Sequence, residues 1–179
     1  MEKIYSNNDL KIIKYDCEDY LSNPNEIIKN YGQIFESYEN NSVNFDRESS
    51  NKNLMATLND FLTEETASLY ILYKKNIPVS AVTFTTENDH SHLELIVTRK
   101  DYRLWGFAKL ISLEAFKDLK KQGVRDISLV VNQKNHKSNY LQESLSQVEG
   151  IEAFITEDTD LLGYTFDISC FEDYDQLIC

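Results

Sequence analysis

The sequence "VTRKDYRLWGFAKLISLEAF" (residues 97–116) joins an expected strand to an expected helix, Gly106–Lys121. Gly106 is one of only five glycines in the chain, and it follows a basic loop, Arg99–Arg103. The first N–H groups of a helix lack intrahelical partners, and the helix dipole adds partial positive charge at that end. A residue without a Cβ lets a ligand approach these groups closely. We therefore predict that the turn Arg103–Ala108 binds an anion.

Length and composition predict one soluble globular domain that spans residues 1–179. Hydrophobic residues make up 41% of the chain and charged residues 27%, the balance of an ordinary folded protein. No apolar run approaches the roughly 18 residues of a membrane span, and the first ten residues lack the apolar segment of a signal peptide. The three cysteines lie far apart, as expected for reduced thiols in the cytoplasm.

The charge is distributed unevenly along the chain. The net charge is −12 overall, but it is −8 over residues 1–98, +6 over residues 99–137 and −10 over residues 138–179. This balance argues against nucleic acid as a partner of the whole surface. The basic segment indicates an anionic partner, and the acidic remainder indicates a cationic one. The alternative, that these charges only solvate two helices, stays open.

Hydrophobic periodicity predicts a mixed α/β order. The expected strands are Leu10–Asp16, 68–74, 79–87, His90–Thr98, Asp126–Asn132, 152–156 and 163–169, and the expected helices are 23–39, Leu54–Glu65, Gly106–Lys121 and Asn135–Val148. We expect a polar loop at Asn40–Asn53. Strict alternation along His90–Thr98 would place Leu93, Leu95 and Val97 on one face, and His92, Glu94, Ile96 and Thr98 on the other.

The turn carries the spacing R-x-x-G-x-A, which by itself is a weak motif. No Gly-Lys-Ser/Thr follows, so it is not a Walker A loop, and the first two glycines of a dinucleotide fingerprint are missing. The whole order of elements resembles the GNAT family of acyl-CoA-dependent N-acyltransferases. Its Q/R-x-x-G-x-G/A signature is matched by Arg103, Gly106 and Ala108. A second hallmark, a strand followed by an Asn-led helix, is matched by the set Asn135, Ser138, Leu141 and Leu145.

The resemblance covers roughly Leu10–Ser169 and is specific in Leu93–Leu145. It implies the GNAT-like acyl-CoA N-acyltransferase fold, a mixed and mostly antiparallel central sheet flanked by helices, and a strand that splays from its neighbour at a bulge. It also implies acetyl-CoA as co-substrate and direct attack of an amine on the thioester. The implied cofactor-binding residues are Ile96, Val97 and Thr98 for the pantetheine, Arg103, Leu104, Trp105, Gly106, Phe107 and Ala108 for the pyrophosphate, and Asn135.

The acceptor ammonium must lose a proton before it attacks, so a base is needed. Glu94 is the first candidate and His92 the second, with His90 on the same strand face. These residues could instead be an exposed strand end. A metal site at His-x-His-x-Glu lacks a further ligand nearby, and we expect no metal.

The sequence departs from the family at the expected acid. Gln142 stands where a tyrosine is usual, and glutamine cannot give a proton to a thiolate. Tyr140 is the nearest tyrosine in sequence, although it lies about 200° around the helix from Gln142. Water or another tyrosine could serve instead. Trp105 either covers the helix end or forms a lid over the cofactor.

Acidic residues favour a cationic primary amine as acceptor: a small amine, a polyamine or a protein lysine. The candidates are Glu36, Glu39, Asp46 and Glu48 near the polar loop, and Glu157, Asp158 and Asp160 in the late hairpin. Two alternatives remain, a non-catalytic CoA-binding sensor or interaction module of the same fold, and a different α/β protein that binds phosphate at Gly106. The sequence indicates no membrane partner and leaves the oligomeric state open, a dimer included.

Overall fold

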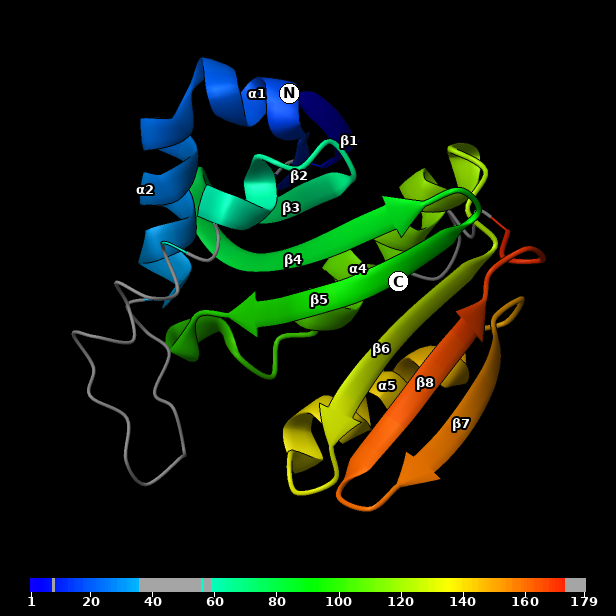
Figure 1. The fold of residues 1–179 in the computed structure, drawn as a ribbon. Helices are drawn as coiled ribbons and strands as arrows, with labels where there is room; N and C mark the ends of the chain where they lie inside the picture. The colour runs from blue at the N-terminus through cyan, green and yellow to red at the C-terminus, as the bar shows by residue number, and fades with distance from the viewer. Residues whose placement is uncertain (8, 36–55, 57–58, 173–179) are drawn as a thin grey trace.

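The computed structural model describes residues 1–7, 9–35, 56 and 59–172, which form one eight-stranded sheet in the order β1-β2-β3-β4-β5-β6-β8-β7 (Figure 1). The strands are β1 (Glu2–Ser6), β2 (Leu10–Tyr15), β3 (Ala67–Lys74), β4 (Ile77–Glu87), β5 (His90–Thr98), β6 (Asp126–Asn132), β7 (Glu152–Asp158) and β8 (Leu161–Asp167). All neighbours pair antiparallel except β5 and β6, which pair parallel. The predicted fold class, a mixed and mostly antiparallel sheet flanked by helices, is confirmed.

Helices cover both faces of the sheet. The helices α1 (Cys17–Ser22) and α2 (Pro24–Phe35) pack on one face, and α4 (Phe107–Lys121) and α5 (His136–Ser146) lie on the other (Figure 1). A short 3-10 helix, η1 (Lys100–Tyr102), stands between β5 and α4. Among the described residues, no helix has the length and apolar content needed to cross a membrane.

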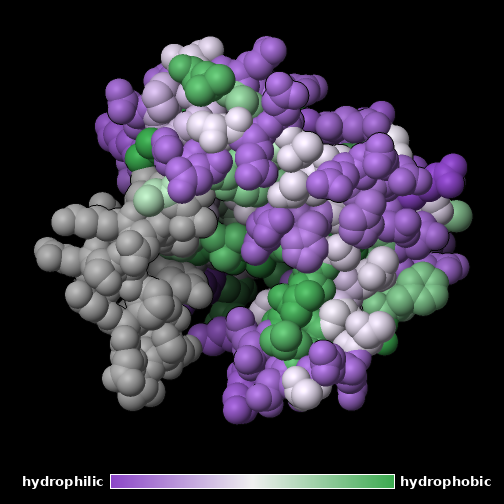
Figure 2. All heavy atoms as spheres, viewed as in Figure 1, coloured by the Kyte–Doolittle hydropathy of each residue, from purple (hydrophilic) through white to green (hydrophobic). Residues whose placement is uncertain are grey.

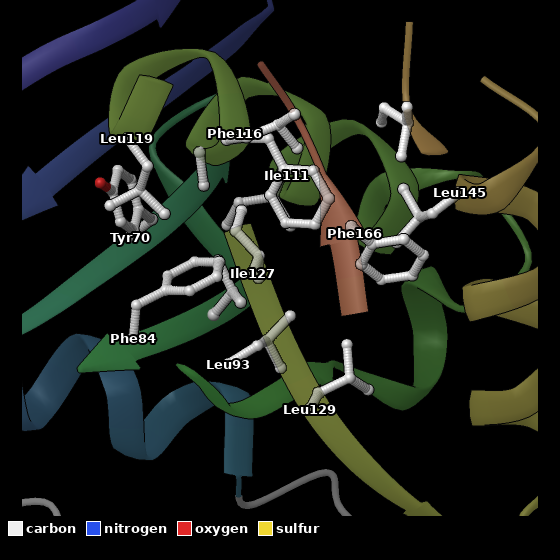
Figure 3. Packing of buried hydrophobic residues seen from close by; sticks show 14 of the residues in the cluster. Tyr70, Phe84, Leu93, Ile111, Phe116, Leu119, Ile127, Leu129, Leu145 and Phe166 are labelled. Atoms are coloured by element: carbon white, nitrogen blue, oxygen red, sulfur yellow. The ribbon is translucent and has the colours of Figure 1, made fainter. Parts of the chain in front are cut away.

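The central strands have apolar residues on both faces because each face has its own core. In β3, Tyr70 and Leu72 belong to the core under α4, whereas Leu69 and Ile71 belong to the core under α2. A strand buried on both faces reads as a continuous apolar run. Figure 3 shows the core under α4, where Phe116 lies between two aromatic rings, with centroids 6.3 Å from Phe84 and 5.9 Å from Phe166.

A β-bulge in β5 overturns the predicted alternation of that strand. Thr83 pairs with Leu95, but Phe84 pairs with Leu93, so Glu94 is an extra residue in β5. An extra residue reverses the alternation beyond it. As a result Leu93 packs in the core under α4, while Leu95 and Val97 pack in the core under α2, and the expectation that these three share a face is wrong.

The bulge also separates the other four residues of the strand that were expected together. Ile96 packs with Leu93 against the core under α4. Thr98 Oγ1 lies 2.8 Å from Ser80 Oγ, within hydrogen-bond distance. His92 and Glu94 therefore do not share their face with Ile96.

Other differences concern short or polar elements. The sequence did not indicate β1 or α1, and the expected strand end at Asp16 is instead the N-cap of α1, with its side chain accepting from Asp19 N. Of the expected helix Leu54–Glu65, Ala56 and residues 59–62 are described and helical. The acidic candidates Glu36, Glu39, Asp46 and Glu48 lie outside the described residues, as does the loop Asn40–Asn53.

Candidate active site

Strands β5 and β6 part soon after they meet. They pair only at three positions, from His90 with Asp126 to His92 with Ser128. The bulge at Glu94 follows directly, and a bulge bends the strand that carries it. Figure 1 shows the two strands diverging, and Figure 2 shows this face of the molecule hollowed at the same place. The family resemblance implied this splay, and the structure has it.

The parting leaves one edge of β5 without a strand partner in the described chain from Leu93 onward. Ile96, Val97 and Thr98, the expected pantetheine residues, lie on this stretch. Two of their carbonyls have side-chain donors, since Ser80 Oγ donates to Val97 O at 2.9 Å and Arg103 Nε donates to Thr98 O at 3.2 Å. The remaining edge groups are available to an extended ligand that adds to the sheet.

The predicted anion turn lies between β5 and α4. Gly106 is the N-cap of α4 with φ +79°, a left-handed conformation that favours glycine, and Leu104 is also left-handed at φ +65°. The first helical bond runs from Leu110 N to Gly106 O at 2.9 Å. In the described part of the chain, the backbone N–H groups of residues 105–109 donate to no carbonyl outside the helix, so the helix start can bind an anion.

The basic segment of the sequence splits into two parts in space. Lys117, Lys120 and Lys121 lie toward the far end of α4, about 15–20 Å from its start at 1.5 Å per residue. Lys117 pairs there with Glu114 at 3.1 Å. Only the part of the basic segment near the turn can serve the anion site.

Cations near the turn come from more than the predicted loop. Arg103 is fixed by its bond to Thr98 O, and Lys109 Nζ donates to Ser144 O of α5 at 2.9 Å. The Nε atom of Arg99 is buried and has no hydrogen-bond partner in the described residues. Lys74, which the sequence did not point to, comes from the end of β3 and places Nζ 4.1 Å from the centre of the Trp105 ring.

Aromatic residues cover the start of α4. The Trp105 ring lies 6.0 Å from both Tyr102 and Phe107, and the side chain of Trp105 remains 59% exposed. Phe107 is buried, Ala108 is half-buried and Leu104 is fully exposed. These contacts support the interpretation of Trp105 as a cover over the helix end.

The three acid–base candidates reach one side of the sheet. His90 Nε2 and His92 Nδ1 each lie 2.9 Å from Ser128 Oγ, and Glu94 Oε1 accepts from Thr85 Oγ1 at 2.9 Å. Thr85 is the β4 residue in register with His92. The sequence analysis did not point to Ser128 or Thr85, because their contacts with these three side chains follow from strand register, which no local sequence pattern reveals.

Helix α5 separates the candidates that the sequence placed on it. Asn135 is its N-cap, with Oδ1 accepting from Ser138 N at 3.3 Å. Gln142 is fully buried, and both polar atoms of its side chain lack a partner in the described residues. Tyr140 is 74% exposed, and within the described residues it forms no hydrogen bond with His92 or Glu94, so the structure does not join it to them.

A buried tyrosine lies closer to the parting strands. Tyr164 of β8 is in register with Leu129, the first β6 residue beyond the last pair with β5. Burial raises the pKa of the Tyr164 hydroxyl, and the negative charge of Glu143 adds to the rise. Its hydroxyl therefore stays protonated at neutral pH.

The described residues contain no group of three or more His, Cys, Asp or Glu side chains that could hold a metal ion. A helix start that can bind an anion, beside two parting strands with carboxylate and imidazole groups at the branch point, is the arrangement expected of an acyltransferase that uses a phosphate-bearing thioester. Residues 14–138 match the family described as Acetyltransferase (GNAT) domain. The chain belongs to this family and is a GNAT-type acetyltransferase.

Solved structures share the fold of this chain. The ribosomal-protein-S18-alanine N-acetyltransferase of Escherichia coli is 16% identical, with 95% of this chain and 99% of that one covered and a TM-score of 0.58. The PaiA N-acetyltransferase of Thermoplasma acidophilum, in complex with coenzyme A, is 15% identical over 87% of this chain and 97% of that one, with a TM-score of 0.56. A variant of the spermidine N-acetyltransferase SpeG from Vibrio cholerae is 14% identical, with 95% of this chain and 100% of that one covered and a TM-score of 0.62.

At such low identity these likenesses show the fold alone. No curated protein sequence matches this chain.

Proposed function

We propose that this chain, as one domain over residues 1–179, transfers an acetyl group from acetyl-CoA to a primary amine by direct attack on the thioester. The observation that carries the proposal is the parting of β5 and β6, with the Gly106 turn at the end of the loop that follows β5. An extended pantetheine can add to the free edge of β5 while its diphosphate reaches the helix start.

The residues of the turn fit a diphosphate. Free N–H groups of residues 105–109 and the dipole of α4 supply fixed positive potential, and the Gly106 backbone adopts a conformation that a side chain would strain. Arg99, Arg103 and Lys74 add cationic charge around the same point. Trp105 and Phe107 line the start of the helix. Asn135, the N-cap of α5, is proposed to contact the same ligand, as the family resemblance implies.

The proposed acid–base residues lie where the strands part. Bound acetyl-CoA supplies an activated acyl group that needs no covalent enzyme intermediate. Glu94 takes the proton of the acceptor ammonium, with His92 as the second candidate, and N–H groups on the free edge of β5 stabilise negative charge on the carbonyl oxygen. Tyr164 is better placed than Tyr140 to give a proton to the departing thiolate, because it lies beside the branch point.

The acceptor is proposed to be cationic. Glu157, Asp158 and Asp160 lie exposed on the β7–β8 hairpin, and the chain has no Lys or Arg after residue 137. The negative electrostatic potential of these carboxylates attracts a protonated amine before it binds. Proteins with this fold include a spermidine N-acetyltransferase and an N-acetyltransferase of a ribosomal protein, so polyamines and protein amines are both in the proposed class.

The competing candidate is a CoA-binding module without catalysis, which the replacement of the usual tyrosine by Gln142 favours. Calorimetry with acetyl-CoA and release of free thiol with a panel of amines separate the two. The proposal expects saturable binding and acceptor-dependent thiol release. Binding without release for every amine would favour the module, and no binding would reject both.

A further inference from the structure

One serine hydroxyl joins two histidine rings where β5 and β6 part. The atoms His90 Nε2 and His92 Nδ1 each lie 2.9 Å from Ser128 Oγ. His92 is the last β5 residue paired with β6, and Ser128 is its partner. A hydroxyl offers one donor and two acceptor positions, so it can link both rings in one hydrogen-bonded chain. We call His90, Ser128 and His92 the histidine bridge.

The two ends of the histidine bridge have different surroundings. His92 is half-buried, and the neighbouring Glu94 carboxylate is held by Thr85, the β4 residue in register with His92. Nε2 of His92 makes no hydrogen bond with any described residue and can accept one from the site. His90 is exposed to solvent. The bridge therefore leads from the proposed base to water.

Negative charge gathers at the outer end. Glu87 of β4 and Asp126 of β6 are both in register with His90. Asp167 of β8 pairs in register with Asp126. The other charged groups around the bridge lie in the flanking loops and on α2: Asp89, Arg125 and the exposed Glu26 and Lys29. Carboxylates on both sides attract a proton that arrives at His90.

We propose that the histidine bridge carries the acceptor's proton from the site to solvent, a role that rests on the proposed acetyl transfer. The proton that Glu94 takes from the ammonium passes through water to Nε2 of His92. The Nδ1 proton of His92 then moves to Ser128 Oγ, while the Ser128 hydroxyl proton moves to Nε2 of His90. His90 gives its Nδ1 proton to water, so Glu94 is again a carboxylate and one proton has left. After the product leaves, proton exchange with bulk water at both ends of the bridge returns the two rings and the hydroxyl to their starting tautomers.

General proton affinities support this direction. Imidazole is more basic than carboxylate, which favours transfer from a carboxyl group to an imidazole. Imidazole both accepts and releases protons near neutral pH, which suits a step that repeats at every turnover.

The test compares Ser128→Ala and Ser128→Thr, with Thr165→Ala as the matched control. Thr165 is in register with Ser128 on β8, and its hydroxyl contacts neither histidine. The turnover number is measured with saturating acetyl-CoA and amine, in dilute buffer and with added imidazole. A positioned general acid or base contributes about 100-fold or more, and water can partly replace one lost member of a relay. We expect Ser128→Ala to lose about tenfold in kcat, with KM unchanged, and to recover in imidazole, whereas Ser128→Thr and Thr165→Ala stay near wild type.

His90→Asn provides a second variant, since His90 is exposed and its loss leaves the cores intact. It should show the same buffer-dependent loss. Ser128→Ala with wild-type turnover in dilute buffer, or with a loss that imidazole does not restore, would overturn the proton route and leave acetyl transfer standing. A wild-type chain that transfers to no amine would instead overturn the proposed function, and the route with it.

Discussion

Replacement of Gly106 by aspartate should abolish CoA binding while the chain still folds. A Cβ at Gly106 meets no atom within 4 Å, so the substitution causes no clash, but its φ of +79° costs a side chain about 1 kcal/mol. For a chain of this size that cost lowers the melting temperature by about 2–4 °C. A carboxylate about 5 Å from a phosphate charge adds about 3 kcal/mol of repulsion at an effective dielectric constant of 20. The repulsion alone raises the Kd by about 100-fold or more.

Gly123 offers a matched control at the other end of α4. Its φ is +95°, and a Cβ there also meets nothing within 4 Å. Gly123→Asp should therefore lose similar thermal stability but keep its CoA affinity, and Gly106→Ala should separate backbone strain from charge. Calorimetry measures the CoA affinity of each variant, and thermal melts measure its stability. If Gly106→Asp binds CoA as tightly as Gly123→Asp, the turn is not the anion site.

Three further predictions test other parts of the structure. Glu94→Gln should lower kcat by about 100-fold or more with little change in acetyl-CoA affinity, while Glu149→Gln, at an exposed residue after α5, stays near wild type. Full activity of Glu94→Gln would show that another group is the base. Gln142→Leu should raise the free energy of unfolding by about 1 kcal/mol in denaturant titration, because it removes a buried amide without partners, and a loss would show that the amide is satisfied. Hydrogen bonds from the Ser169 side chain and backbone, with smaller help from Arg125, lower the pKa of Asp167. The Asp167 carboxylate therefore stabilises the folded chain above the usual Asp pKa, and this stabilisation is lost as pH falls through the lowered pKa. Asp167→Asn should thus narrow the difference between the melting temperatures at neutral and acid pH. An unchanged difference would contradict this.

The long elements could be predicted because their periodicity is strong. The ranges of β5 and β6 agree with the sequence to the residue, and α4 begins and ends as its apolar spacing, Gly106 and Gly123 indicated. The strand β1 and the six-residue α1 were missed, since elements this short and exposed carry little hydrophobic signal. The bulge at Glu94 could not be predicted either, because it is defined by pairing with β4.

The same limit applies to the site. The turn around Gly106 could be predicted because its chemistry is local: a basic loop, a glycine and a helix start. Ser128, Thr85 and Lys74 reach the site from other strands, and only the sheet order brings them there. The basic segment, residues 99–137, is continuous in sequence but does not form one basic patch in space, because the fifteen-residue helix α4 separates its two ends.

The central claim is that the diphosphate of CoA binds the start of α4 while its pantetheine adds to the free edge of β5. A crystal structure of the chain grown with CoA tests this directly. We expect phosphate oxygens within hydrogen-bond distance of the N–H groups of residues 105–109, and pantetheine amides beside Ile96–Thr98. CoA bound at another surface, with this turn in contact with solvent alone, would contradict the account.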